Sequence, residues 1–253
     1  MLPPRLLSGA ACAAALALAA PAGAADLTEM TPEERAAFRA EVRAYLLENP
    51  EVIMEAVAVL EQREAAARDA ADRELIAENA EAIFDDGYSW VGGNPEGDIT
   101  LVEFIDYRCS YCRRAHEDVN ELVESDGDIR LVIKEFPILG PDSMASSRFA
   151  IAAKQVAGDA AYHAAKEALI RMTGEVNEVT LGRLADSLGL DADAILVQMQ
   201  SPEVTEEIAR TRALADRLGI SGTPTFVLPD RMLRGYAPLD AMRQIVAEVR
   251  DPG

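Results

Sequence analysis

The chain has 253 residues, of which 44 are acidic and 24 basic, and its formal net charge at pH 7 is -20. A surface with this excess of negative charge repels phosphate groups, which argues against nucleic acid and anionic membranes as partners. With 49% hydrophobic residues, the chain can bury the core of one ordinary domain and have a smaller accessory region besides.

The first 24 residues have the pattern of a secretory signal peptide. Arg5 supplies a positive charge, residues 6–20 are apolar and uncharged, and small residues that suit a cleavage site end at Ala24. The apolar run is short and only weakly hydrophobic for a membrane anchor. We therefore expect export with cleavage after Ala24, in preference to an uncleaved anchor.

A helical arm is predicted next, over residues 28–85. Threonine as N-cap, followed by proline and two glutamates, begins a helix at Thr31. Asn49 and Pro50 interrupt its apolar pattern, and a second helix, apolar at first and then highly charged, continues to about Ile83. The apolar face needs a partner, which is either the body of the same subunit or another copy of the chain. The arm is therefore a candidate for oligomerisation.

Alternation of strand and helix patterns follows the arm. Turn-forming residues flank a short strand over 88–91, and an apolar strand is predicted over 99–106. A helix over 109–125 and a second apolar strand over 129–136 come next. A strand, helix and strand in this order imply a parallel pair of strands.

The next part of the chain, residues 141–218, predicts only helices, separated by turns that contain glycine or proline. We interpret it as an inserted helical subdomain. Residues 225–228 and 232–235 predict a hairpin, and a last helix covers 238–249. This order matches an α/β thioredoxin fold with a helical insertion.

Cys109 and Cys112 form a CxxC motif, called the CxxC pair below, at the start of the helix predicted over 109–125. Unpaired backbone N–H groups and the positive end of a helix dipole favour a thiolate there and lower its pKa. One helical turn brings the second sulfur within disulfide reach of the first. We therefore predict a redox-active disulfide, with Cys109 as nucleophile and Cys112 as resolving cysteine. The third cysteine, Cys12, lies in the predicted signal peptide.

Two motifs more than a hundred residues apart carry a family resemblance. Residues 104–112 read Phe-Ile-Asp-Tyr-Arg-Cys-Ser-Tyr-Cys, and residues 219–226 read Gly-Ile-Ser-Gly-Thr-Pro-Thr-Phe. Over residues 88–253 the chain resembles the DsbA-like family of exported thiol-disulfide oxidoreductases. Residues 45–52 of the arm look like the N-terminal extension of its ScsC-like subgroup, named for suppression of copper sensitivity, some of whose members oligomerise through this extension.

The resemblance implies a function and partners. It implies disulfide exchange with exported cysteine-containing proteins in the periplasm and recharging by a membrane redox partner. It implies no cofactor, because the electrons reside in the CxxC pair. The dipeptide Ser110-Tyr111 lacks the histidine that strengthens an oxidant, and its tyrosine is similar to that of the isomerase branch. Oxidase, isomerase and reductase directions all stay open, as do the reduction potential and the substrates.

The resemblance also assigns four further catalytic residues. It implies a cis peptide bond before Pro224, with Thr223 presenting its backbone to an extended substrate. Glu103 and Lys134, on neighbouring strands, are expected as a buried pair beneath the active site that exchanges protons with Cys112. The alternative is that both side chains simply reach solvent from strand ends.

Copper binding by the reduced thiols is the competing function. His116 follows the CxxC pair by four residues and extends it to a metal-like pattern. However, Cys109 and His116 would be separated by roughly 10 Å along a helix, too far for one ion, and no fourth ligand is evident. We therefore predict no resident metal site and keep a copper-binding protein as the alternative.

Overall fold

The structure of the protein, a computed structural model, describes residues 30–251. The signal peptide predicted for residues 1–24 lies outside the described residues. The chain divides into two compact units, Met1–Leu60 and Glu61–Gly253. Within the described part of the chain, no helix combines the length and the apolar character needed to cross a membrane.

The first unit contains the helix α1 (Pro32–Glu48) and the beginning of α2 (Glu51–Glu78). A capping box begins α1, because the side chain of Thr31 accepts from the N–H of Glu34 while the carboxylate of Glu34 accepts from the N–H of Thr31. None of the residues of α1 is buried. Phe38, for example, exposes 46% of its surface, so the helix has an apolar face without a partner among residues 30–60.

The second unit begins within α2, so the boundary differs from the one expected at residue 85. Ile76 near the end of α2 and Ile83 in α3 (Ala80–Phe84) are buried in a hydrophobic cluster on one face of the sheet. Asp72 accepts two hydrogen bonds from the guanidinium of Arg234, at 2.7 and 2.9 Å. Residues 61–85 therefore belong with the body, because their apolar and acidic side chains find partners there.

A mixed five-stranded sheet is the centre of the second unit, with strand order β1-β3-β2-β4-β5. Its strands are β1 (Trp90–Gly93), β2 (Ile99–Ile105), β3 (Ile129–Glu135), β4 (Thr225–Val227) and β5 (Met232–Arg234). Strands β2 and β3 are parallel, as predicted, and the other pairs are antiparallel. The predicted α/β order is confirmed, with strand ends within two residues of those expected.

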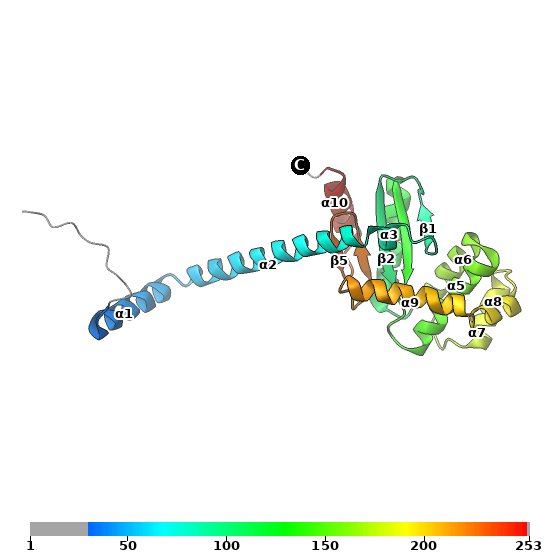
Figure 1. The fold of residues 1–253 in the computed structure, drawn as a ribbon, viewed down its shortest axis with the longest axis horizontal. Coiled ribbons are helices and arrows are strands. Elements are labelled where there is room, and N and C mark those ends of the chain that lie inside the picture. The colour runs from blue at the N-terminus through cyan, green and yellow to red at the C-terminus, as the bar shows by residue number, and fades with distance from the viewer. Residues whose placement is uncertain (1–29, 252–253) are drawn as a thin grey trace, which may run out of the picture. The chain divides into compact units, whose positions relative to one another are not determined.

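Helices cover both faces of the sheet. The insertion consists of α5 (Pro141–Ala157), α6 (Asp159–Arg171), α7 (Glu178–Ser187), α8 (Ala192–Gln198) and α9 (Pro202–Arg217). Helices α4 (Ser110–Asp126) and α10 (Leu239–Arg250) contribute to the larger hydrophobic cluster, together with α5 and α6. The second cluster, on the opposite face, contains residues of α2, α3 and α9. Figure 1 shows α9 crossing in front of the strands.

Candidate active site

The CxxC pair lies where β2 leads into α4. Cys109 is the N-cap residue and α4 begins at Ser110, which matches the predicted helix start. Both cysteines are buried free thiols. The Sγ atom of Cys109 lies 3.1 Å from the carbonyl oxygen of Thr223, and the Thr223–Pro224 peptide bond is cis, the isomer expected from the sequence. The structure thus brings the CxxC pair together with Thr223 and Pro224, which follow it by more than a hundred positions in the chain.

The pKa values of the two thiols of the CxxC pair are shifted in opposite directions. A hydrogen bond from Cys112 lowers the pKa of Cys109 from 9.0 to about 5, and the backbone N–H groups of Cys112 and Tyr111 act in the same direction. The same hydrogen bond and burial raise the pKa of Cys112 far above its ordinary value. At neutral pH Cys109 is therefore a thiolate and Cys112 a thiol. A nucleophile beside a protonated reserve thiol is the arrangement that disulfide exchange requires.

A buried carboxylate, which the sequence analysis did not identify, anchors the loop before the CxxC pair. Asp106 accepts a hydrogen bond from the N–H of Arg108 at 2.8 Å. Its other oxygen accepts from the N–H groups of Ile138 and Leu139, at 2.8 and 3.0 Å. These three bonds hold the loop after β2 against the loop after β3. An aspartate at the end of a predicted strand, just before the CxxC pair, was the available signal.

Two arginines connect the CxxC pair to the helical insertion. Arg113, which directly follows Cys112, donates to the carbonyl oxygen of Met172 at 2.8 Å and to that of Tyr107 at 3.0 Å. Arg108 donates to the same Met172 oxygen at 3.4 Å. Since Met172 is the C-cap of α6, the arginines hold the end of that helix beside the first turn of α4.

The comparisons with known proteins identify the family. A family model described as a DSBA-like thioredoxin domain matches residues 100–247, and one described as the copper resistance protein ScsC N-terminal domain matches residues 34–67. The chain belongs to the DsbA-like thioredoxin family. The resemblance found in the sequence, including the ScsC-like N-terminal domain, is therefore confirmed.

Solved structures agree with this assignment. A thioredoxin-like oxidoreductase from Silicibacter pomeroyi is 43% identical, with a TM-score of 0.62, over 67% of this chain and 96% of that one. The thiol-disulfide exchange protein alpha-DsbA2 of Wolbachia pipientis is 26% identical, with a TM-score of 0.67, over 72% and 98%. A variant of ScsC from Proteus mirabilis shares the fold, at 23% identity and a TM-score of 0.65, over 89% and 99%.

Curated relatives are longer than this chain. A Na(+)/H(+) antiporter NhaA of Salinispora tropica is 30% identical over 156 residues, which are 62% of this chain and 24% of the antiporter. The chain thus spans about a quarter of the length of the curated relatives that it matches.

The prediction that Glu103 and Lys134 form a buried pair is wrong. Both side chains are buried, but on opposite faces of the sheet, because the register places Glu103 beside Ile133 and Lys134 beside Phe104. Lys134 forms an ion pair with Asp86 and donates to a carbonyl of α3 at 2.8 Å. The alternative, that both side chains reach solvent, is also wrong. Of these two residues, Glu103 lies on the face of the sheet that carries the CxxC pair.

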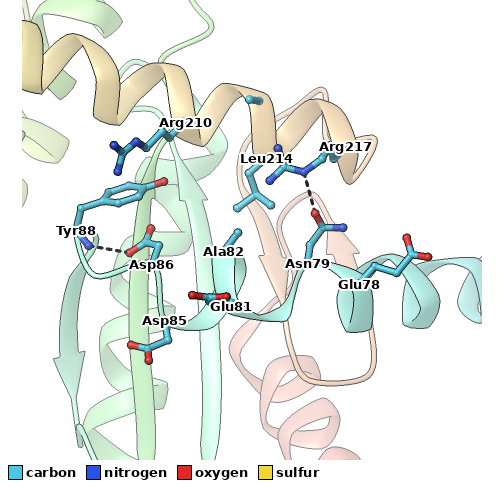
Figure 2. Close-up of a pocket in the computed structure, with 11 residues that line it drawn as sticks. Glu78, Asn79, Glu81, Ala82, Asp85, Asp86, Tyr88, Arg210, Leu214 and Arg217 are labelled. Carbon is cyan, nitrogen blue, oxygen red and sulfur yellow. Dashed lines mark hydrogen bonds between the residues drawn. The ribbon is translucent and has the colours of Figure 1, made fainter.

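A hollow of about 520 Å³ lies on the Lys134 side of the sheet, between α3 and α9. Figure 2 shows Asp86 accepting from the N–H of Tyr88, and Arg217 donating to Asn79, along this hollow. Acidic, basic and apolar side chains line the rest of it, and none of the predicted site residues is among them. The CxxC pair belongs to the hydrophobic cluster on the other face of the sheet.

A second buried carboxylate, Glu135 on β3, was also missed. The hydroxyl groups of Tyr107 and Tyr162 both donate to its Oε1 atom, at 2.6 and 2.5 Å. Burial raises the pKa of Glu135 to about 7, and the tyrosine hydrogen bonds oppose that rise. Burial likewise raises the pKa of Glu103 to about 7. Two acids that titrate near neutral pH therefore lie on the face of the CxxC pair.

His116 lies in a polar network instead of facing the sulfurs. Its Nε2 atom is 3.0 Å from a carboxylate oxygen of Glu167 on α6 and 3.3 Å from the amide nitrogen of Asn120. Burial lowers the pKa of His116. Among the described residues, no group of three or more His, Cys, Asp or Glu side chains is arranged to hold a metal ion.

Proposed function

We propose that the protein is an exported thiol-disulfide oxidoreductase that exchanges disulfides with cysteine-containing proteins in the periplasm, as an oxidase or an isomerase. The observation that carries the proposal is the position of Cys109, which is the N-cap of α4 and has its Sγ atom 3.1 Å from the carbonyl oxygen of Thr223, just before the cis Pro224. The lowered pKa of Cys109 and the raised pKa of Cys112 agree with it. Membership of the DsbA-like family supports it, as does the sequence pattern of residues 1–24.

The reaction begins with the Cys109 thiolate, which attacks one sulfur of a substrate disulfide. The substrate disulfide bond breaks, its other sulfur leaves as a thiolate, and Cys109 and the attacked sulfur form a mixed disulfide. Cys112 then loses its proton and attacks the sulfur of Cys109, and the substrate sulfur leaves as a thiolate with the electron pair. The substrate gains two electrons and the CxxC pair becomes a disulfide. The reverse sequence donates a disulfide to a substrate dithiol. Thr223, whose carbonyl oxygen lies next to the attacking sulfur, presents its backbone to an extended substrate.

Insulin reduction and the refolding of a scrambled disulfide protein test this activity. The wild-type protein is expected to accelerate at least one of them, and Cys109→Ser to abolish the effect. Cys112→Ser keeps the nucleophile, so it should accumulate a mixed disulfide with the substrate. If the wild-type protein matches Cys109→Ser in both assays, the proposal is refuted. Which of the two assays responds more strongly distinguishes isomerase from reductase activity.

Export and recharging follow from the same proposal. A membrane redox partner must return the CxxC pair to one redox state after each turnover. Alkylation of the thiols in fractionated cells measures that state, and a periplasmic pool held almost entirely in one state is expected. A protein found only in the cytoplasm would contradict the proposed export.

Copper binding by the reduced CxxC pair is the second candidate. It is favoured by the match of residues 34–67 to the N-terminal domain of a copper resistance protein and by two adjacent free thiols, which suit Cu(I). Titration of the reduced protein with Cu(I), with Cys109→Ser as control, discriminates the candidates. Stoichiometric binding without any disulfide exchange would favour the copper function.

Self-association through the first unit is the proposed oligomeric contact. The apolar side chains of α1 and the start of α2 border a hollow of about 320 Å³, where Phe38 and Ile53 are about half exposed. Phe38→Glu with Ile53→Glu should lower the mass measured by light scattering. Val197→Glu, which changes an apolar residue of α8 that is 75% exposed, should leave it unchanged. Equal masses for all three proteins would refute the contact.

A further inference from the structure

A partly exposed arginine directly precedes the nucleophile of the CxxC pair. Arg108 is the residue before Cys109, and 25% of its side chain is exposed. Its backbone N–H donates to Asp106 at 2.8 Å, and one nitrogen of its guanidinium donates to the carbonyl oxygen of Met172 at 3.4 Å. Backbone and side chain are therefore both held, which keeps the charge beside the CxxC pair while solvent still reaches it.

The donors of Arg108 are only loosely occupied. A guanidinium has five N–H donors. The contact of Arg108 with Met172 is long for a hydrogen bond, and the same oxygen already accepts from Arg113 at 2.8 Å. Among residues 30–251, the carboxylate that pairs with Arg108 is that of Asp142 in the first turn of α5, and it is 3.7 Å away. Arg108 therefore keeps donors for a further acceptor.

The neighbouring charges leave this guanidinium available to a substrate. Burial and the charge of Arg108 lower the pKa of Arg113, and the charge of Asp106 raises it. Asp106 is fully buried, and its two oxygens already accept three backbone N–H groups. Asp142 is 38% exposed, and water weakens its ion pair with Arg108. A carboxylate that approaches Arg108 more closely can displace that of Asp142.

The sign of this charge is opposite to that of the whole chain. A net charge of -20 disfavours acidic partners in general. Salt screens exposed charges that are more than about 10 Å apart, so Arg108 favours only a carboxylate that lies close to the substrate cysteine. An extended peptide advances about 3.3 Å per residue. The carboxylate must therefore belong to a residue within about three positions of that cysteine.

We propose that Arg108 is a specificity-determining residue, which selects substrate segments that have an acidic side chain close to the reacting cysteine. The inference rests on the proposed function. The substrate carboxylate displaces Asp142 and accepts hydrogen bonds from the free N–H groups of Arg108, while the bonds made and broken are those of the proposed reaction. A charge-assisted pair at a partly exposed position corresponds to a rate advantage of about threefold to fivefold.

Peptide disulfides of equal charge test this selectivity in the full chain. Two fifteen-residue peptides have a central cysteine joined to pyridine-2-thiol. The near peptide has an aspartate two positions before and two positions after the cysteine, and the far peptide has both aspartates at its ends. The Cys109 thiolate attacks the peptide sulfur, the disulfide bond of the probe breaks, and pyridine-2-thiolate leaves with the electron pair and is followed by its absorbance.

The ratio of the two rates, near over far, is the quantity compared. Both peptides have the same net charge, so the field of the whole protein acts on them nearly alike. The same ratio measured with mercaptoethanol corrects for the intrinsic reactivity of each peptide. The corrected ratio of the wild-type protein should be about three to five, and it should fall toward one at high salt. A change in the acidity of Cys109 alters both rates equally and cancels in the ratio.

Three variants assign the ratio to its cause. Arg108→Gln should bring the corrected ratio to about one. Asp142→Asn should raise it above that of the wild type, because the competing carboxylate is gone. Arg114→Gln is the matched control: it removes one positive charge from an exposed position of α4, where the guanidinium lies over the ring of Tyr236, 5.8 Å from its centre. Its ratio should equal that of the wild type.

The outcomes separate this inference from the proposed function. A corrected ratio that is the same in the wild type and Arg108→Gln, or an equal loss in Arg114→Gln, would overturn the selectivity. If Arg108→Gln does not fold, Asp142→Asn decides, because a ratio that does not rise contradicts the competition. If the wild type reacts with neither peptide faster than Cys109→Ser does, the proposed function fails and the selectivity with it. Reaction with both peptides at equal corrected rates refutes the selectivity alone.

Discussion

Replacement of Glu103 by glutamine should make the protein more stable at alkaline pH. Burial raises the pKa of Glu103 from 4.5 to about 7. Unfolding exposes this carboxyl group to water, where it ionises at a lower pH. At about 1.4 kcal/mol for each pH unit, the difference corresponds to a cost of about 3 kcal/mol for the folded wild type above pH 7. The stabilising contribution of the neutral carboxyl is complete below pH 4.5 and is lost as the pH rises through 7. Glutamine is neutral throughout and avoids that loss.

Urea unfolding at pH 4.5 and at pH 8 measures this effect. The oxidised protein is used, so that the thiols of the CxxC pair do not titrate. The free energies of unfolding of wild type and Glu103→Gln should be similar at pH 4.5 and differ by about 3 kcal/mol, in favour of the variant, at pH 8. Glu117→Gln, at an exposed position of α4, is the matched control and should give nearly the same difference at both pH values. A gap between Glu103→Gln and wild type that does not widen with pH would refute the reasoning.

Three further results are expected. Alkylation of the reduced protein should give a midpoint near pH 5 for Cys109, and Cys112→Ala should raise that midpoint because it removes the main hydrogen bond to the thiolate; a midpoint near 9 would contradict the assignment. The pKa of Cys109 is lower in the folded protein than in the unfolded chain, so the thiolate stabilises the reduced form increasingly as the pH rises above 5. Urea unfolding should therefore show the reduced protein gaining stability relative to the oxidised protein between pH 5 and 8. A difference between the two forms that does not change with pH would contradict this. Lys134→Met should cost about 3–5 kcal/mol, because it leaves Asp86 buried without its cation, and Asp86→Asn in the same chain should restore part of that loss in urea unfolding.

The position of the CxxC pair shows how far local pattern reaches. The apolar run of β2 and the helical spacing after Cys109 are properties of consecutive residues, so the sequence placed the pair at a helix start. The Gly-Thr-Pro-Thr segment around Pro224 was recognised by its motif, although its contact with Cys109 spans 114 positions. Family resemblance, and not periodicity, supplied that long-range contact.

The arm shows where local pattern stops. Capping at Thr31 and the break at Asn49 were predicted from neighbouring residues and are present in the structure. The expected boundary at residue 85 did not match the division after Leu60. Ile76 and Asp72 look like ordinary members of an amphipathic helix, and only the sheet face and the guanidinium that they meet separate them from the arm.

The sequence by itself determined the elements, their order and the two reactive cysteines, because helical and strand periodicity, capping and turn chemistry act between residues a few positions apart. Only the tertiary structure decided that Lys134 lies away from Glu103. The face on which a strand lysine lies depends on the register between β2 and β3, and a register one residue away would exchange the two faces. The register turns Lys134 toward Asp86, on the face of the sheet opposite to Glu103.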